Sequence, residues 1–271
     1  ELATGRMTGM EALVRWNHPD RGLVSPDSFV NLAEESGLML PLGEWVLRTA
    51  CTQAAQWARS GRPPVTMSVN LSMRQFQQRD LSQQVAKILA ETGLDPKLLV
   101  LELTESCLMD QVSATVQKLR DLKRLGMKIA IDDFGTGYSS LSYLSQLPID
   151  ELKIDRSFVQ NLNHDRNATM ISSAIIAMAR SLHLKVVAEG IETQDQLNFL
   201  RHSGCHLVQG YLYAPPLQVA DLECWWQAET QTIDAERAAG TGANQGNPGF
   251  SQNTVKVTGD GPKIWPKTGL G

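Results

Sequence analysis

The segment KIAIDDFGTG, residues 128–137, decides the fold, because a short apolar run ends there in two carboxylates followed by glycines. The run predicts a buried β-strand, and the glycines predict a turn directly after it. Side chains alternate along a strand, so Ile129 and Ile131 are expected on the face opposite Asp132. The sequence therefore predicts a strand that presents the acid pair Asp132 and Asp133 at its carboxyl end.

Further apolar runs along the chain also end in polar side chains. The early runs are MEAL at residues 10–13, TMSVNLS at 66–72 and LVLELTES at 99–106, and shorter ones lie at 151–154, 185–188 and 206–210. The early runs present Glu11, Asn70 and Glu102, each an oxygen donor. Together with residues 128–135, they predict seven strands.

Amphipathic helices are expected between these strands, which gives a repeating β/α pattern. The expected helices span residues 42–60, 82–91, 113–125, 168–182 and 194–202. Parallel strands with helical crossovers close into a barrel, whose chemistry gathers at the carboxyl ends of the strands. An open doubly wound sheet is the alternative, but it normally has a glycine-rich phosphate loop after its first strand, and the sequence has none there. We therefore expect an α/β barrel.

The strand-end residues favour metal-assisted hydrolysis. Carboxylate and amide oxygens suit Mg²⁺ or Mn²⁺ better than zinc, and a doublet such as Asp132 and Asp133 can serve two ions at once. Alternation in MEALVR places Arg15 on the face of Glu11, where a guanidinium could bind a phosphate. The same alternation adds further members to this polar ring, namely Lys153, Glu189 and Gln209. Single acids at strand ends are often helix caps, but this many on one face favours ligation.

Composition excludes several other functions. The chain has 271 residues, of which 42% are hydrophobic and 20% charged, and a net charge of -4. This composition predicts one sizeable core, and the negative net charge gives no electrostatic reason to expect DNA or an anionic membrane as a partner. No stretch is long enough to span a bilayer, and the cysteines, without CxxC spacing, fit buried thiols in a reducing cytoplasm. We expect a cytoplasmic domain, which an upstream segment could anchor to a membrane.

A set of motifs in this chain resembles the EAL domain family. They are EALVRW at 11–16, VNLS at 69–72, ELTES at 102–106, DDFGTGYSSL at 132–141, LPIDELKIDRSFV at 147–159, VVAEGIET at 186–193 and QGYLYAPP at 209–216. The resemblance implies a modified TIM (β/α)8 barrel. It also implies hydrolysis of the bacterial second messenger cyclic di-GMP to linear 5'-pGpG with Mg²⁺ or Mn²⁺, and two ions are expected.

The resemblance also implies roles for individual residues. One ion would be held by Glu11, Asn70, Glu102 and Asp132, and the second by Asp132, Asp133 and Glu189. Lys153 would position the attacking water, and whether Glu189 acts as ligand or base is left open. Glu105 would anchor the loop of residues 132–140, and Glu192 would support the metal site. The implied substrate contacts are Leu13, Arg15 and Gln209.

Other interpretations of the sequence remain open. One is a catalytically silent EAL domain that serves as a cyclic di-GMP receptor or protein-interaction module, and another is an unrelated Mg²⁺-dependent barrel enzyme that enolises a carboxylic acid. Asp155 and Arg156 fit either a guanine contact or a helix start. His202 and His206 have a spacing that could suit zinc, but no third ligand follows, so surface or core histidines are the better interpretation.

The two ends of the chain differ from the family pattern. The sequence begins inside the hairpin that would follow the first barrel strand, so we expect that strand to be missing and an upstream GGDEF or sensory domain in a longer protein. We expect the barrel to span residues 1–228. Residues 229–271 are rich in Gly, Asn, Thr and Gln and are expected to be a disordered tail. The family also links the loop of residues 132–140 to dimerisation, which implies a homodimer.

Overall fold

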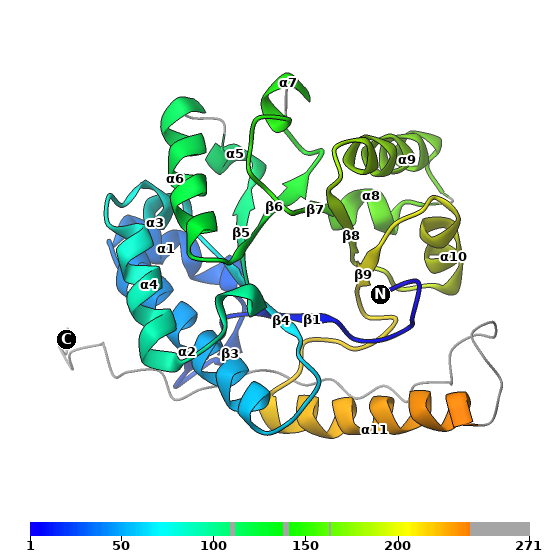
Figure 1. The fold of residues 1–271 in the computed structure, drawn as a ribbon, viewed down its shortest axis with the longest axis horizontal. Coiled ribbons are helices and arrows are strands. Elements are labelled where there is room, and N and C mark those ends of the chain that lie inside the picture. The colour runs from blue at the N-terminus through cyan, green and yellow to red at the C-terminus, as the bar shows by residue number, and fades with distance from the viewer. Residues whose placement is uncertain (109–111, 138–140, 163, 239–271) are drawn as a thin grey trace.

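A parallel β-sheet forms the centre of the protein. The structure is a computed structural model, and it describes residues 1–108, 112–137, 141–162 and 164–238. Its main sheet has seven strands in the order β1-β4-β5-β6-β7-β8-β9, and every neighbouring pair is parallel. The strands are β1 (Gly9–Ala12), β4 (Thr66–Asn70), β5 (Leu99–Thr104), β6 (Lys128–Phe134), β7 (Glu151–Ile154), β8 (Lys185–Glu189) and β9 (Leu207–Gln209). They are the seven predicted strands, and their curled arrangement confirms the barrel class (Figure 1).

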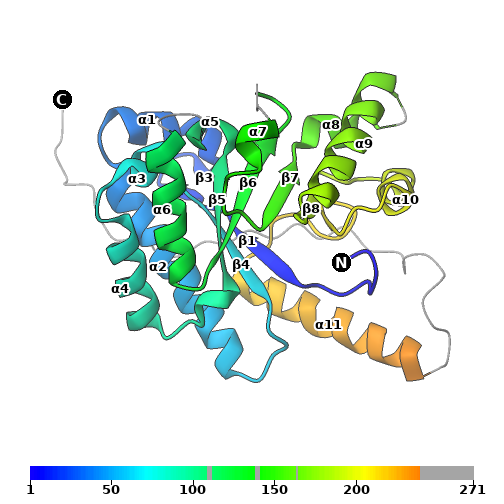
Figure 2. The ribbon, with the colours of Figure 1, turned by 45° about the horizontal axis from the view of Figure 1, so that its top comes forward.

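Helices cover the outside of the curled sheet. They are α1 (Val30–Glu35), α2 (Met39–Arg59), α3 (Met73–Gln77), α4 (Leu81–Thr92), α5 (Glu105–Leu108), α6 (Val112–Arg124), α7 (Leu141–Leu144), α8 (Arg156–Gln160), α9 (Arg166–Ser181), α10 (Gln194–His202) and α11 (Val219–Ala238), with short 3-10 turns η1 (Pro26–Ser28) and η2 (Pro96–Leu98). Figures 1 and 2 show α2, α4 and α6 outside one half of the sheet, and α8, α9 and α10 outside the other. No helix within the described ranges is both long and apolar enough to cross a membrane.

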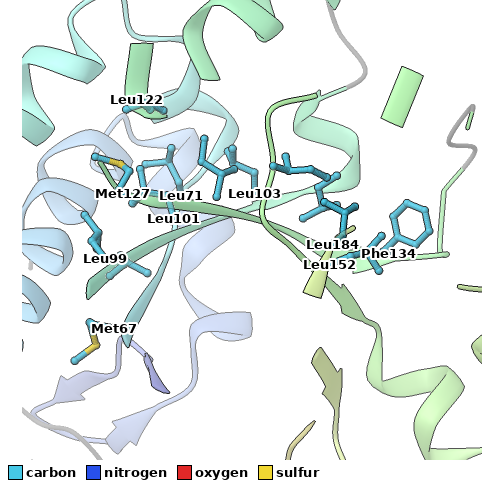
Figure 3. Packing of buried hydrophobic residues seen from close by; sticks show 14 of the residues in the cluster. Met67, Leu71, Leu99, Leu101, Leu103, Leu122, Met127, Phe134, Leu152 and Leu184 are labelled. Carbon is cyan, nitrogen blue, oxygen red and sulfur yellow. The ribbon is translucent and has the colours of Figure 1, made fainter. Parts of the chain in front are cut away.

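Strand β5 shows how the core positions the site. Leu99, Leu101 and Leu103 are fully buried, and they lie among other core side chains between the sheet and its helices (Figure 3). Each such side chain contributes about 1.5–3 kcal/mol through removal of its apolar surface from water. Because residues alternate along a strand, Glu102 points to the opposite face, which is the inside of the curl. The packing of three leucines therefore fixes the direction of one acid.

A small antiparallel hairpin follows the first strand and was not predicted. Strands β2 (Trp16–His18) and β3 (Gly22–Val24) form it. The Trp16 ring meets the Phe29 ring edge-on, with a centroid separation of 6.0 Å. The hairpin therefore packs on the segment that leads into α1.

The two edge strands of the sheet are bridged by the segment that precedes β1. The backbone N–H of Leu2 donates a hydrogen bond to the carbonyl of His206 at 3.0 Å, just before β9. The chain start accordingly lies beside β9 (Figure 1). This contact brings the two ends of the strand order towards each other.

The last helix extends beyond residue 228, where the predicted barrel ends. Helix α11 continues to Ala238, so residues 229–238 are helical rather than disordered, and residues 239–271 of the expected tail lie outside the described residues. The indole N–H of Trp57 donates to Glu223 at 2.6 Å, and the rings of Trp57 and Trp226 meet edge-on. These contacts hold the first half of the helix against α2, and good helix formers such as Ala, Glu and Arg extend it.

Candidate active site

Four carboxylates from four strands surround one lysine inside the curled sheet. Lys153 lies in β7 and is 2% exposed. Its Nζ lies 2.5 Å from Glu102, 2.6 Å from Glu189, 3.2 Å from Asp132 and 3.6 Å from Glu11. These acids come from β5, β8, β6 and β1, and they meet because parallel strands present their carboxyl ends at one edge of the sheet. The structure thus assembles five of the residues predicted for the site.

The charges in this cluster do not balance. Burial would by itself lower the pKa of Lys153, but the surrounding carboxylates outweigh it and hold that pKa well above the ordinary value. Burial raises the pKa of both Glu102 and Glu189, and the attraction of Lys153 offsets this only in part. One ammonium is therefore too little positive charge for these acids.

Two amide side chains fix the orientation of Glu11. Asn70 Nδ2 donates to Glu11 Oε1 at 2.6 Å, and Gln209 Nε2 donates to Glu11 Oε2 at 2.7 Å. The amides come from β4, which pairs with β1, and from β9, at the other end of the strand order. Both oxygens of Glu11 are thus hydrogen-bonded, and Gln209, predicted as a substrate contact, bonds to this acid.

Asp133 adopts an unusual backbone conformation at the end of β6. Its φ is +53°, in the left-handed region that aspartate tolerates better than most residues. Its backbone N–H donates to Asp132 Oδ1 at 3.0 Å. Burial, followed by the neighbouring charges of Asp132 and Asp155, raises the pKa of Asp133 to about 6. The turn thereby places two consecutive carboxyl groups near one site.

Glu105 contacts the loop after β6. Its Oε2 accepts a hydrogen bond from the backbone N–H of Gly135 at 3.2 Å, and Gly135 has a φ of +102° that favours glycine. A Cβ on Gly137 would come within 2.7 Å of Glu105 Oε1. These contacts are those expected of a loop anchor, although that role stays a prediction, and residues 138–140 lie outside the described residues.

An open cleft of about 540 Å³ adjoins the cluster. It is lined by Glu11, Asp27, Asp133, Thr136, Asp155, Arg156 and Glu189. Asp155 also caps α8 by accepting the N–H of Ser157 at 3.0 Å, so its helix-start role is present together with its place in the cleft. Asp27 and Thr136 were not predicted, since neither lies at a strand end.

Other predicted residues lie apart from the cluster. Arg15 donates through Nη1 to the carbonyl of Val14 at 2.8 Å, because β1 ends at Ala12 and its alternation does not continue to Leu13 and Arg15. Neither Leu13 nor Arg15 lines the cleft. Glu192 is exposed and accepts a hydrogen bond from Gln160 at 3.0 Å. The structure therefore gives these residues no contact with the four acids.

The donor chemistry suits a hard divalent cation. All of the donors are carboxylate or amide oxygens, which Mg²⁺ and Mn²⁺ prefer. Glu189 Oε1 is buried and lies 2.6 Å from the ammonium of Lys153. Among the residues that the structure describes, no group of three acids, histidines or cysteines is arranged so that it could hold a metal ion. Lys153 lies between the acids instead. The donor atoms of these residues are therefore of the type that such an ion prefers, but their arrangement around Lys153 does not match its coordination.

The fold and the strand-end cluster define a barrel protein with an acidic site, and comparison with known proteins gives its family. The family model described as EAL domain matches residues 1–216. This chain therefore belongs to the EAL domain family.

Two curated relatives from Pseudomonas aeruginosa are named cyclic di-GMP phosphodiesterases. One, NbdA, is 47% identical over 222 residues, which is 82% of this chain and 28% of the relative. The other, PA2567, is 44% identical over 225 residues, which is 83% of this chain and 38% of the relative. The chain thus spans well under half the length of these relatives.

Among solved structures, one similar protein is the phosphodiesterase PaMucR in complex with c-di-GMP. It has a TM-score of 0.79 and 46% sequence identity, and the match covers 81% of this chain and 89% of that one. This likeness supports the modified barrel fold across the described strands.

Proposed function

We propose that this chain hydrolyses cyclic di-GMP to linear 5'-pGpG by metal-assisted attack of water on a phosphodiester. The observation that carries the proposal is the convergence of Glu11, Glu102, Asp132 and Glu189 on Lys153 at the carboxyl ends of parallel strands. Relatives that share this domain are named cyclic di-GMP phosphodiesterases, and one solved relative is a complex with c-di-GMP.

Charge balance favours two divalent ions over one. The site gathers five carboxylates, Glu11, Glu102, Asp132, Asp133 and Glu189, against the single ammonium of Lys153. Two divalent ions together with Lys153 would supply five positive charges and neutralise the set, whereas one ion would leave two negative charges in a buried site. When bound, such ions activate water and offset the charge of a phosphodiester.

Individual side chains would hold the ions and orient the attacking water. Glu11, held by Asn70 and Gln209, would present an oriented carboxylate, and Asp132 with Asp133 would serve both ions. Lys153 would orient the attacking water and stabilise negative charge on the phosphate. Glu189 would act as ligand or as proton acceptor for that water.

The cleft supports a nucleotide substrate of this kind. Its 540 Å³ is within the range of small-molecule sites, and Arg156 lies on its wall as a cation for a phosphate or a base. Arg15, which alternation predicts as a phosphate contact, donates instead to the carbonyl of Val14 here. We propose that it turns towards the substrate on binding.

The test is hydrolysis of cyclic di-GMP by the purified chain with Mg²⁺ or Mn²⁺, with the product resolved by chromatography. We expect pGpG from the parent and none from Glu11→Ala, because that change removes a carboxylate proposed to hold one of the ions. A matched control is Glu44→Ala, which removes a surface carboxylate whose partner is Arg48. Equal turnover by the parent and Glu11→Ala would contradict the proposal, and binding without turnover in the parent would instead favour a receptor.

A further inference from the structure

Lys153 occupies the centre of the acid cluster. An ammonium has three protons to donate, and Glu102, Glu189 and Asp132 lie 2.5, 2.6 and 3.2 Å from its Nζ. Glu11, at 3.6 Å, is an ion-pair neighbour beyond hydrogen-bond distance. The lysine thus contacts the carboxylates that the proposed function assigns to divalent ions.

We infer, building on that proposed function, that Lys153 is an internal counter-ion that holds the acid cluster together without metal and competes with divalent ions for it. A Mg²⁺ ion takes its oxygens at about 2.0–2.1 Å and demands near-ideal geometry. An ammonium 2.5 Å from one of those oxygens would lie beside the ion and repel it. Binding of metal therefore requires Lys153 Nζ to withdraw from at least Glu102.

The competition gives Lys153 two opposing effects. Without metal, it offsets the repulsion among buried acids, so its loss should destabilise the protein. With metal, its charge opposes that of the ions, so its loss should tighten their binding. A lysine that only oriented water would produce neither effect on a protein without substrate.

The test is Mn²⁺ binding to chelator-treated protein, followed by electron paramagnetic resonance, for the parent and Lys153→Met. Methionine keeps the length of the side chain and removes its charge. We expect Lys153→Met to bind Mn²⁺ about tenfold or more tightly and to melt at a lower temperature in EDTA than the parent. Unchanged or weaker Mn²⁺ binding by the variant would overturn the inference.

A matched control is Lys128→Met. Lys128 also pairs with a buried carboxylate, Glu151, at 3.3 Å, but it does so at the amino end of β6 and β7. Its loss should leave the affinity for Mn²⁺ unchanged. If this control tightened Mn²⁺ binding as strongly as Lys153→Met, general loss of positive charge would explain the effect and the inference would fail.

A second measurement keeps the inference testable if Lys153→Met does not fold without metal. In protein labelled with ¹⁵N-lysine, the buried ammonium should give a slowly exchanging signal that is absent from Lys153→Arg. We expect Mg²⁺ to shift or abolish that signal, and an unchanged signal at saturating Mg²⁺ would overturn the inference. Absence of any Mn²⁺ binding by the parent would instead overturn the proposed function, and this inference with it.

Discussion

At the scale of single residues, the hydrogen bonds of Glu11 are as informative as its charge. Each of its oxygens accepts from a different amide, Asn70 at 2.6 Å and Gln209 at 2.7 Å. A carboxylate held in this way keeps one orientation, and hydrogen-bond partners of metal ligands typically account for tenfold to a hundredfold in metal affinity. Gln209, predicted from resemblance as a substrate contact, is therefore also expected to tune the metal site.

Gln209→Ala tests this second role. Since it removes a donor to Glu11, we expect Mn²⁺ affinity in the absence of substrate to fall about tenfold. The surface variant Gln194→Ala is the control, because Gln194 bonds only to Asn198 among the contacts described. A raised KM with unchanged Mn²⁺ affinity would show that Gln209 serves the substrate alone.

The residue scale also shows where sequence reasoning succeeds and where it fails. Alternation predicted the direction of Glu102 correctly, because β5 continues two residues beyond it to Thr104. It failed for Arg15, because β1 ends at Ala12 and the chain turns into a hairpin that alternation cannot anticipate. Strand periodicity predicts side-chain direction only as far as the ladder of hydrogen bonds extends.

At the scale of elements, the turn after β6 depends on a neighbouring element. Glu105, at the start of α5, is 4% exposed and accepts the N–H of Gly135. The turn also contains Asp133 with its positive φ, so its conformation carries strain that contacts must offset. The position of one acid of the site is thus expected to depend on a residue in another element.

Glu105→Ala tests this dependence. We expect Mn²⁺ affinity and turnover to fall at least about tenfold, because the turn that carries Asp133 loses its acceptor. Glu105→Gln keeps an acceptor oxygen and should retain more of both. If Glu105→Ala bound Mn²⁺ and hydrolysed cyclic di-GMP like the parent, the anchor role would be wrong.

Helix α11 contains a carboxyl group that is costly to ionise. Burial raises the pKa of Glu229 to about 7, so the folded protein holds this proton more tightly than the unfolded chain does. The resulting destabilisation is absent at pH below the unfolded pKa, grows as pH rises and is complete above pH 7. The helical extension that contains Glu229 was missed because glycine and asparagine further along dominated the composition of the predicted tail.

Glu229→Gln removes this cost. Discounted for partial exposure, the gain at pH 8 should be about 1 kcal/mol, or roughly 2–4 °C in Tm. The gain should shrink at pH 5, where the folded carboxyl is protonated. Asp221→Asn, which changes an exposed acid at the start of the same helix, is the control in these thermal melts. A Glu229→Gln effect that is equal at both pH values would contradict the burial of this carboxyl.

At the scale of the whole molecule, the sequence predicted the strands well and the centre of the site less well. A local apolar run indicates each strand, and the helical crossovers between them indicate a parallel order. The contacts of Lys153 depend instead on four strands that curl around it, and periodicity gives the face of a side chain but no distance across a barrel. Alternation placed Lys153 in the polar ring, but residue types alone could not give its distances from the acids.

This curled arrangement predicts that divalent ions stabilise the entire fold. The acids of the site come from β1 at one end of the strand order and from strands as far as β8 near the other. Ions bound between these acids would therefore link strands from both ends of the sheet. A ligand at a hundred times its dissociation constant adds about 2.7 kcal/mol, which corresponds to roughly 5–10 °C in Tm for a chain of this size. We expect Mg²⁺ to raise the Tm of EDTA-treated protein by that amount.

Ca²⁺ and Glu11→Ala separate binding from catalysis in the same thermal melts. Ca²⁺ accepts irregular oxygen geometry, so it should also raise the Tm while supporting little hydrolysis of cyclic di-GMP. Glu11→Ala should lose most of the stabilisation by either ion, because without the ligand on β1 the ions no longer link this strand to the others. A Tm that Mg²⁺ leaves unchanged, or raises equally in Glu11→Ala, would mean that ions do not join these strands, and the acids would then require another partner for their charge.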